Sequence, residues 1–281
     1  MITTATPVEF KTSIGRVAGL RYGPVSGKLL VAVPGLSQDA RSLDALASRL
    51  ASNDRQVLAI TPRGRGGSEA TAPGTYGWEN HAGDVAEIAT QLGQTNFDLL
   101  GWSFGGLVAL KATALFAKRV RKLVLIDVVG KPDPSSLVVI AKGLERLGAV
   151  FPTRQAYVDL VLSSGAMAGF EEVWRPYLEG DLVDVEGGFT TRTNKQAVVE
   201  DAVYGAQQDV YTLWPSVIMP ALLVRAGREI LPGMGRIVSD EDSRRFPDEV
   251  KSAEVITVDA NHYGVGYHPD AIAAIDKFLA S

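Results

Sequence analysis

The sequence predicts an α/β fold in which a mostly parallel, twisted sheet is flanked by helices and carries a mainly helical insertion. Short apolar runs alternate along the chain with stretches of helical periodicity, a pattern typical of parallel strands joined by right-handed crossovers. Between about residues 131 and 217 the strand pattern gives way to several helix-like stretches. We therefore predict a core of residues 1–130 and 218–281, with residues 131–217 folded over it as a helical cap.

The elements of the core can be predicted in chain order. Alternating residues at 8–12 and 16–22 predict an N-terminal hairpin. A continuous apolar run predicts a strand buried on both faces at residues 29–33. Short, largely apolar segments predict further strands at residues 57–60, 97–100, 122–126, 221–224 and 255–258. Helical spacing predicts helices at 43–50, 85–92, 107–116 and 271–279, and within the insertion at 137–147, 155–162 and 170–177.

Composition narrows the classes of function. With 281 residues, 46% hydrophobic and 21% charged, the chain can bury a large core. A net charge of −4 gives no electrostatic attraction to nucleic acid or to an anionic membrane. The absence of cysteine excludes disulfides and a thiolate nucleophile. The N-terminus lacks a signal-peptide pattern and no apolar stretch is long enough to span a bilayer, so we expect a cytoplasmic protein.

Residues 101–105, G-W-S-F-G, carry the strongest chemical signal. They follow an apolar strand and precede an apolar helix, which is the context that a G-x-S-x-G nucleophile elbow requires. The glycines permit a very tight turn, and the turn would leave the hydroxyl of Ser103 free at the carboxyl edge of the sheet. A serine that only caps the helix is the alternative. We predict that Ser103 is a nucleophile.

A serine nucleophile needs a neighbouring base, and the chain has three histidines, His81, His262 and His268. His262 follows the late strand 255–258 by a short loop, so it would emerge at the same edge of the sheet as Ser103. His81 opens a predicted helix and His268 precedes the last one, so both are more readily explained as structural. We predict His262 as the base.

The carboxylate that would orient His262 has two candidates. Asp127 directly follows the strand at 122–126, and Glu229 follows the strand at 221–224 by a few residues. Asp127 ends the strand next to the nucleophile strand, so its short side chain could reach His262. We favour Asp127 and keep Glu229 as the alternative acid.

These motifs together resemble the α/β-hydrolase superfamily, and the resemblance covers nearly the whole chain. Besides the elbow, residues 62–68, P-R-G-R-G-G-S, are similar to its R-G-x-G-x-S loop, and residues 261–263, N-H-Y, to its late histidine. Residues 33–36, V-P-G-L, are similar to its oxyanion loop. The resemblance implies that the backbone N–H groups of Leu36 and Phe104 bind the oxyanion.

The sequence also departs from the common family pattern. Pro34 stands where a histidine is usual, Thr61 stands where an aspartate is usual, and residues 225–229, R-A-G-R-E, lack the usual G-x-x-D. Zearalenone-type lactonases and 2-(acetamidomethylene)succinate hydrolase place the acid earlier, after the strand that follows the nucleophile helix. Residues 125–128, L-I-D-V, resemble that position, and residues 268–270, H-P-D, resemble a feature of the lactonases.

The pocket and the reaction are predicted more coarsely. We expect a serine hydrolase that cleaves a carboxylic ester or lactone of a medium-sized, largely apolar substrate through an acyl-enzyme. The predicted substrate-binding residues are Trp102, Gly35, Trp174, Trp214 and Tyr263. Arg175 and Arg192 could each hold one carboxylate. Amide hydrolysis, carbon–carbon bond hydrolysis and perhydrolase chemistry would use the same triad, and a non-catalytic receptor of the same fold stays an alternative.

The expected partners follow from these features. The chain shows no metal-binding or nucleotide-binding motif, so no cofactor is implied. We expect a small-molecule substrate and no nucleic acid or membrane partner. Homodimer formation is left open by the sequence.

Overall fold

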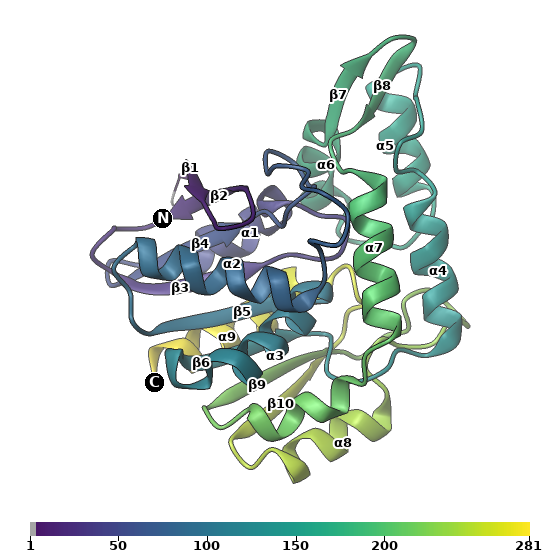
Figure 1. Cartoon of the computed structure of the whole chain (residues 1–281). Coiled ribbons are helices and arrows are strands. Elements are labelled where there is room, and N and C mark those ends of the chain that lie inside the picture. The colour runs from purple at the N-terminus through teal and green to yellow at the C-terminus, as the bar shows by residue number, and fades with distance from the viewer. Residues whose placement is uncertain (1–3) are drawn as a thin grey trace.

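An eight-stranded sheet forms the centre of the computed structural model, which describes residues 4–281 (Figure 1). Its strands lie in the order β1-β2-β4-β3-β5-β6-β9-β10. They are β1 (Thr6–Lys11), β2 (Arg16–Tyr22), β3 (Lys28–Val33), β4 (Arg55–Ile60), β5 (Phe97–Trp102), β6 (Val120–Ile126), β9 (Ala221–Ala226) and β10 (Ala253–Val258). Residues 1–3, which belong to the predicted core segment 1–130 and to the stretch examined for a signal peptide, lie outside the described residues.

The pairing of the strands confirms the predicted sheet. β1 and β2 form an antiparallel hairpin, and β2 pairs antiparallel with β4. From β4 through β3, β5, β6 and β9 to β10, every pair is parallel. The carboxyl ends of these parallel strands therefore meet at one edge, where ligands bind in open α/β sheets.

Helices cover both faces of the sheet, which explains why β3 is continuously apolar from residue 29 to residue 33. Leu30 and Ala32 of β3 pack into a core cluster with α1 (Asp44–Leu50) and α9 (Pro269–Ala280). Leu29 and Val31 point to the opposite face, because side chains alternate along a strand. That face packs against α2 (Trp78–Gln91), α3 (Phe104–Phe116) and α8 (Asp240–Glu249).

Short 3-10 helices lie at η1 (Ala40–Leu43), η2 (Ala117–Arg119), η3 (Val210–Ser216) and η4 (Val265–Tyr267). Within residues 4–281, none of the helices combines the length and apolar character needed to cross a membrane.

The chain between β6 and β9 is mainly helical, as its periodicity predicts. It holds α4 (Pro134–Leu144), α5 (Arg154–Leu162), α6 (Glu171–Gly180), β7 (Leu182–Val185), β8 (Gly188–Thr191) and α7 (Lys195–Ala206). The β7–β8 hairpin was not predicted, because its strands are only four residues long and neither is a continuous apolar run. Gly187, at φ 85°, forms the turn between them.

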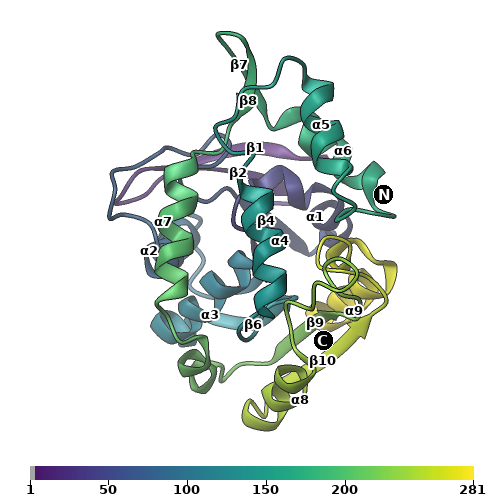
Figure 2. The same ribbon diagram turned by 90° about the vertical axis from the view of Figure 1, so that its right-hand side faces the viewer.

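The insertion lies against loops at the carboxyl edge of the sheet. The hydroxyl of Thr193 donates to the carbonyl of Ser37, in the loop after β3, at 3.2 Å. The backbone N–H of Asn194 donates to the carbonyl of Gly64, in the loop after β4, at 2.8 Å. The Trp174 indole donates to the carbonyl of Tyr263 after β10 at 2.9 Å. Figure 2 shows α4 and α7 crossing in front of this edge.

Candidate active site

Ser103 occupies a strained turn between β5 and α3. Its backbone has φ 55° and ψ −120°, a conformation that non-glycine residues rarely adopt. The flanking glycines are required for space. A Cβ on Gly105 would lie 2.0 Å from the carbonyl oxygen of Val33, and a Cβ on Gly101 would lie 2.2 Å from that of Gly105. Such strain persists only where the surrounding structure enforces it, so the elbow geometry points to a functional serine.

Asp127 and His262 form a buried hydrogen-bonded pair at the same edge. The Asp127 Oδ2 atom lies 2.8 Å from His262 Nδ1, and the two residues are 1% and 6% exposed. The other carboxylate oxygen accepts the backbone N–H of Ala226 at 2.9 Å. Asp127, at φ 48°, and Ser103 are the non-glycine residues with positive φ within residues 4–281. The acid is thus held rigidly, and it fixes which ring nitrogen of His262 faces away from it.

The loop after β10 brings His262 next to the nucleophile elbow. The indole of Trp102, the residue before Ser103, donates to the carbonyl of His262 at 3.2 Å. Asn261 braces the loop, since its side-chain oxygen accepts the N–H groups of Tyr263 and Gly264, each at 3.1 Å. The structure therefore gathers the elbow and the late histidine, which lie far apart in the sequence.

The alternative candidates lie in other interactions. Glu229 accepts the backbone N–H of Gly233 at 2.7 Å, within its own turn. His268 caps the N-terminus of α9, where its side chain accepts the backbone N–H of Asp270 at 3.3 Å. His81 is buried in α2, with its Nε2 atom 3.1 Å from both carboxylate oxygens of Asp201. Of the two candidate acids, the one hydrogen-bonded to His262 is Asp127.

The residues predicted to bind the oxyanion lie on neighbouring segments. Leu36 lies in the loop after β3, which Gln38 braces with two hydrogen bonds of 3.1 Å. Its backbone N–H donates to the carbonyl of Gly35, and its side-chain oxygen accepts the backbone N–H of Gly35. Phe104 opens α3 directly after Ser103. Gly105 packs against Val33 at the end of β3. A helix N-terminus and two backbone N–H donors at this point are the usual components of an oxyanion hole, and this role for Leu36 and Phe104 stays a prediction.

Aromatic side chains gather beside the histidine. The ring of Trp174 lies 6.1 Å from Trp102, 6.2 Å from Tyr263 and 5.4 Å from Tyr267, measured between ring centres. Tyr263 is also 5.5 Å from the His262 ring. The first three had been predicted for the pocket, whereas Tyr267 had not, because its place in η4 after the histidine loop gives no periodic signal.

Three predicted ligand-binding side chains lie elsewhere. Trp214 is 1% exposed, donates to the carbonyl of Val129 at 2.9 Å and packs 5.2 Å from Phe246. These contacts join η3 to α8 and to the segment after β6, and the substrate-binding role of Trp214 stays a prediction. Arg175 lies 4.0 Å from the neighbouring Glu172 on the surface, and Arg192 donates to a backbone carbonyl at 3.1 Å.

Comparisons with known proteins agree with this geometry. Residues 28–161 match the family described as alpha/beta hydrolase fold. The chain has the α/β-hydrolase fold. It is 29% identical over 241 residues to N-formylmaleamate deformylase of Pseudomonas putida, a match covering 85% of this chain and 83% of the relative. It is 24% identical over 274 residues to 2-(acetamidomethylene)succinate hydrolase of Mesorhizobium japonicum, covering 97% and 95% of the two chains.

A solved structure supports the same fold assignment. The crystal structure of E-2-(acetamidomethylene)succinate hydrolase superposes with a TM-score of 0.85 at 20% identity, covering 99% of this chain and all of that one. The resemblance inferred from the motifs is therefore confirmed. The α/β-hydrolase is an enzyme of hydrolytic type.

The insertion of this α/β-hydrolase contains a buried carboxyl group that its sequence pattern did not reveal. Asp181 accepts the hydroxyl of Tyr157 at 3.0 Å and lies 3.9 Å from the guanidinium of Arg41. Burial raises the pKa of Asp181 to about 7, although the guanidinium of Arg146 favours the charged form. The folded protein therefore keeps this proton to a higher pH than the unfolded chain does.

This raised pKa predicts a pH-dependent stability. The contribution of Asp181 is complete below its ordinary pKa of 3.8 and is lost as pH rises through about 7. Between about pH 5 and pH 8 we expect the free energy of unfolding of the wild type to fall by about 2 kcal/mol more than that of Asp181→Asn. Urea unfolding of both proteins at the two pH values measures this difference. Equal losses would contradict the assignment.

Proposed function

We propose that this α/β-hydrolase cleaves a carboxylic ester or a lactone through an acyl-enzyme formed on Ser103. The observation that carries the proposal is the 2.8 Å hydrogen bond between His262 and Asp127, which lies beside the strained serine turn. A serine on such a turn, a histidine from the end of the chain and a carboxylate that orients it are the components of a nucleophilic triad.

The proposed reaction uses both nitrogens of His262. Because Nδ1 is hydrogen-bonded to Asp127, Nε2 is free to accept the hydroxyl proton of Ser103 as its oxygen bonds to the carbonyl carbon. The N–H groups of Leu36 and Phe104 then stabilise the oxyanion. His262 returns the proton to the departing alkoxide, leaving the acyl group on the serine. Water then attacks the acyl-enzyme while His262 accepts its proton, and as the bond to the serine oxygen breaks, His262 returns that proton to Ser103 and the acid is released.

The aromatic side chains beside His262 support an apolar acyl group. The rings of Trp102 and Tyr263 lie 6.1 Å and 6.2 Å from that of Trp174, so the surroundings of His262 on this side are apolar and favour an apolar acyl group over a charged one. The backbone of Gly35 would line the oxyanion side. We propose that residues 131–217 act as the cap that carries Trp174 to this position.

Amide hydrolysis is the second candidate, and the relatives favour it. One is named as a deformylase of N-formylmaleamate and another as a hydrolase of 2-(acetamidomethylene)succinate. The same residues can serve an amide, provided that His262 protonates the departing nitrogen. Carbon–carbon bond hydrolysis would need a ketone at the same carbonyl position.

Substrates that share one acyl group separate these reactions. We expect p-nitrophenyl esters, and lactones of matching size, to be hydrolysed with a higher kcat/KM than the p-nitroanilide that carries the same acyl group. Turnover of the anilide with none of the esters or lactones would replace the first proposal with the second. A protein that turns over none of them and is not labelled by a fluorophosphonate would be a receptor of this fold.

The cellular location, the partners and the oligomeric state of the enzyme are also proposals. We propose a cytoplasmic enzyme with a small-molecule substrate and, in view of its net charge of −4, no nucleic-acid or membrane partner. Homodimer formation stays an open question for sedimentation measurements.

A further inference from the structure

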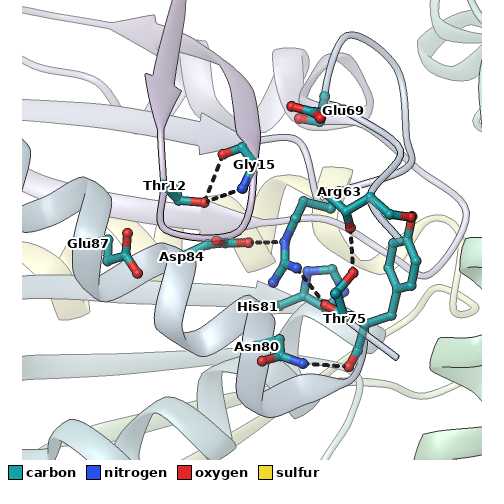
Figure 3. Close-up of polar contacts among 12 residues, drawn as sticks. Thr12, Gly15, Arg63, Glu69, Thr75, Asn80, His81, Asp84 and Glu87 are labelled. Atoms are coloured by element: carbon teal, nitrogen blue, oxygen red, sulfur yellow. Dashed lines mark hydrogen bonds and ion pairs between the residues drawn. The ribbon is translucent and has the colours of Figure 1, made fainter. Parts of the chain in front are cut away.

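Two buried arginines follow β4, and they make different contacts. Arg63 pairs with Asp84 at 2.7 Å and donates to the carbonyl of Thr75 at 2.5 Å, as Figure 3 shows. Arg65 instead pairs with Asp201, on helix α7 of the insertion, at 2.6 Å between Nη2 and Oδ2. Both side chains are fully buried, so each charge depends on its partner.

Arg65 contacts both residues that are proposed to bind the oxyanion. Its Nε donates to the carbonyl of Leu36 at 3.0 Å, and its guanidinium carbon lies 5.6 Å from the centre of the Phe104 ring. Its Nη1 also donates to the carbonyl of Arg63 at 2.7 Å. One rigid planar group thus restrains the loop after β3 and the first residue of α3 at the same time.

Asp201 holds that guanidinium in place. Its carboxylate accepts the backbone N–H of Gly77 at 2.6 Å and lies 3.1 Å from Nε2 of His81. The ring of His81 in turn meets the edge of the Phe104 ring, with centres 5.4 Å apart. Burial alone would raise the pKa of Asp201, but His81 and Arg65 hold it below its ordinary value. Asp201 is therefore a fixed negative charge that orients Arg65.

We propose that Arg65 is a positioning residue for the oxyanion hole, held in place by Asp201 of the insertion. This inference rests on the function proposed above. Oxyanion donors are effective because they are fixed before the charge develops, and Arg65 fixes the segments of both donors. The planar fork of arginine can bind a carboxylate and a carbonyl together, a geometry that lysine cannot reproduce. Because Asp201 lies on α7, the position of the insertion is coupled to the oxyanion hole.

Two matched variants test the proposal, Arg65→Lys and Arg63→Lys. The kcat and KM for a p-nitrophenyl ester are measured together with two inhibition constants. One is for a boronic acid, whose tetrahedral adduct with Ser103 mimics the oxyanion, and the other is for the carboxylic acid product. In Arg65→Lys we expect kcat to fall about 10-fold or more and the boronic acid to bind more weakly by a similar factor.

Selectivity for the transition state distinguishes positioning from a merely structural role. In Arg65→Lys, KM and the product inhibition constant should stay within about 2-fold of the wild type. Arg63→Lys should lower the melting temperature while leaving kcat within about 2-fold, since its contacts lie elsewhere. Equal losses of kcat in the two variants, or unchanged boronic acid binding in Arg65→Lys, would overturn the proposal.

A further pair of variants covers the remaining outcomes. If Arg65→Lys does not fold, Asp201→Asn keeps the shape of the site and should show the same parallel loss of kcat and boronic acid affinity. Unchanged values in folded Asp201→Asn would overturn the inference. Ser103→Ala separates a failure of the proposed function from a failure of the role proposed for Arg65. Turnover in Ser103→Ala would refute the proposed function, whereas an inactive Ser103→Ala beside a fully active Arg65→Lys would refute the role of Arg65 alone.

Discussion

Asp127→Asn is expected to lower kcat for a p-nitrophenyl ester by about 10⁴-fold while KM changes little. The carboxylate accepts a hydrogen bond from Nδ1–H of His262 at 2.8 Å and would stabilise the imidazolium that forms when Ser103 attacks. An asparagine of the same shape carries no charge and can present a donor to Nδ1, which favours the wrong tautomer. Steady-state kinetics on protein of unchanged melting temperature provide the measurement.

Glu229→Gln is the matched control for the acid. Its carboxylate accepts the backbone N–H of Gly233 in a turn of its own, so the amide should leave kcat within about 2-fold of the wild type. If the losses were reversed, with Glu229→Gln inactive and Asp127→Asn active, Glu229 would be the acid and the pair seen in the structure would be structural.

Ser103→Ala is expected to have the largest effect, a fall in kcat of about 10⁶-fold, because no other group can form the acyl-enzyme. The hydroxyl is the only group removed, and the strained turn at φ 55° is enforced by its surroundings, so the variant should fold. The same kinetic assay, with circular dichroism to verify folding, measures this.

The control for Ser103→Ala is His262→Ala, which should be impaired to a comparable degree, since nucleophile and base act as one unit. The double variant should then be no worse than either single one. Losses that multiply in the double variant would mean that the two residues act independently, contrary to the proposed triad.

The fold and the elbow could be predicted because their signals are local. Strand β3 is a continuous apolar run because both faces of the sheet are covered there. The glycines around Ser103 stand where a Cβ would meet backbone at 2.0 to 2.2 Å. His262 could be predicted as the base from its place shortly after strand β10. Each of these inferences needs only a short stretch of sequence and the rule that parallel strands end at one edge.

Other features depend on contacts between distant segments and could not be predicted. Asp127 and Glu229 both follow parallel strands, and only the folded structure shows which one meets His262. Trp214 was predicted for the pocket from its residue type, and only the folded structure shows that its indole donates to the carbonyl of Val129. The ion pair between Arg65 and Asp201 joins a core loop to the insertion, and neither residue alone indicates it.

Treating the folded enzyme with a fluorophosphonate and locating the adduct by peptide mass spectrometry tests the role of Ser103 most directly. We expect one adduct, on Ser103, and far slower labelling in His262→Ala, because that imidazole activates the hydroxyl. An adduct on another residue, or a labelling rate that His262→Ala leaves unchanged, would contradict the claim that Ser103 is a nucleophile activated by His262.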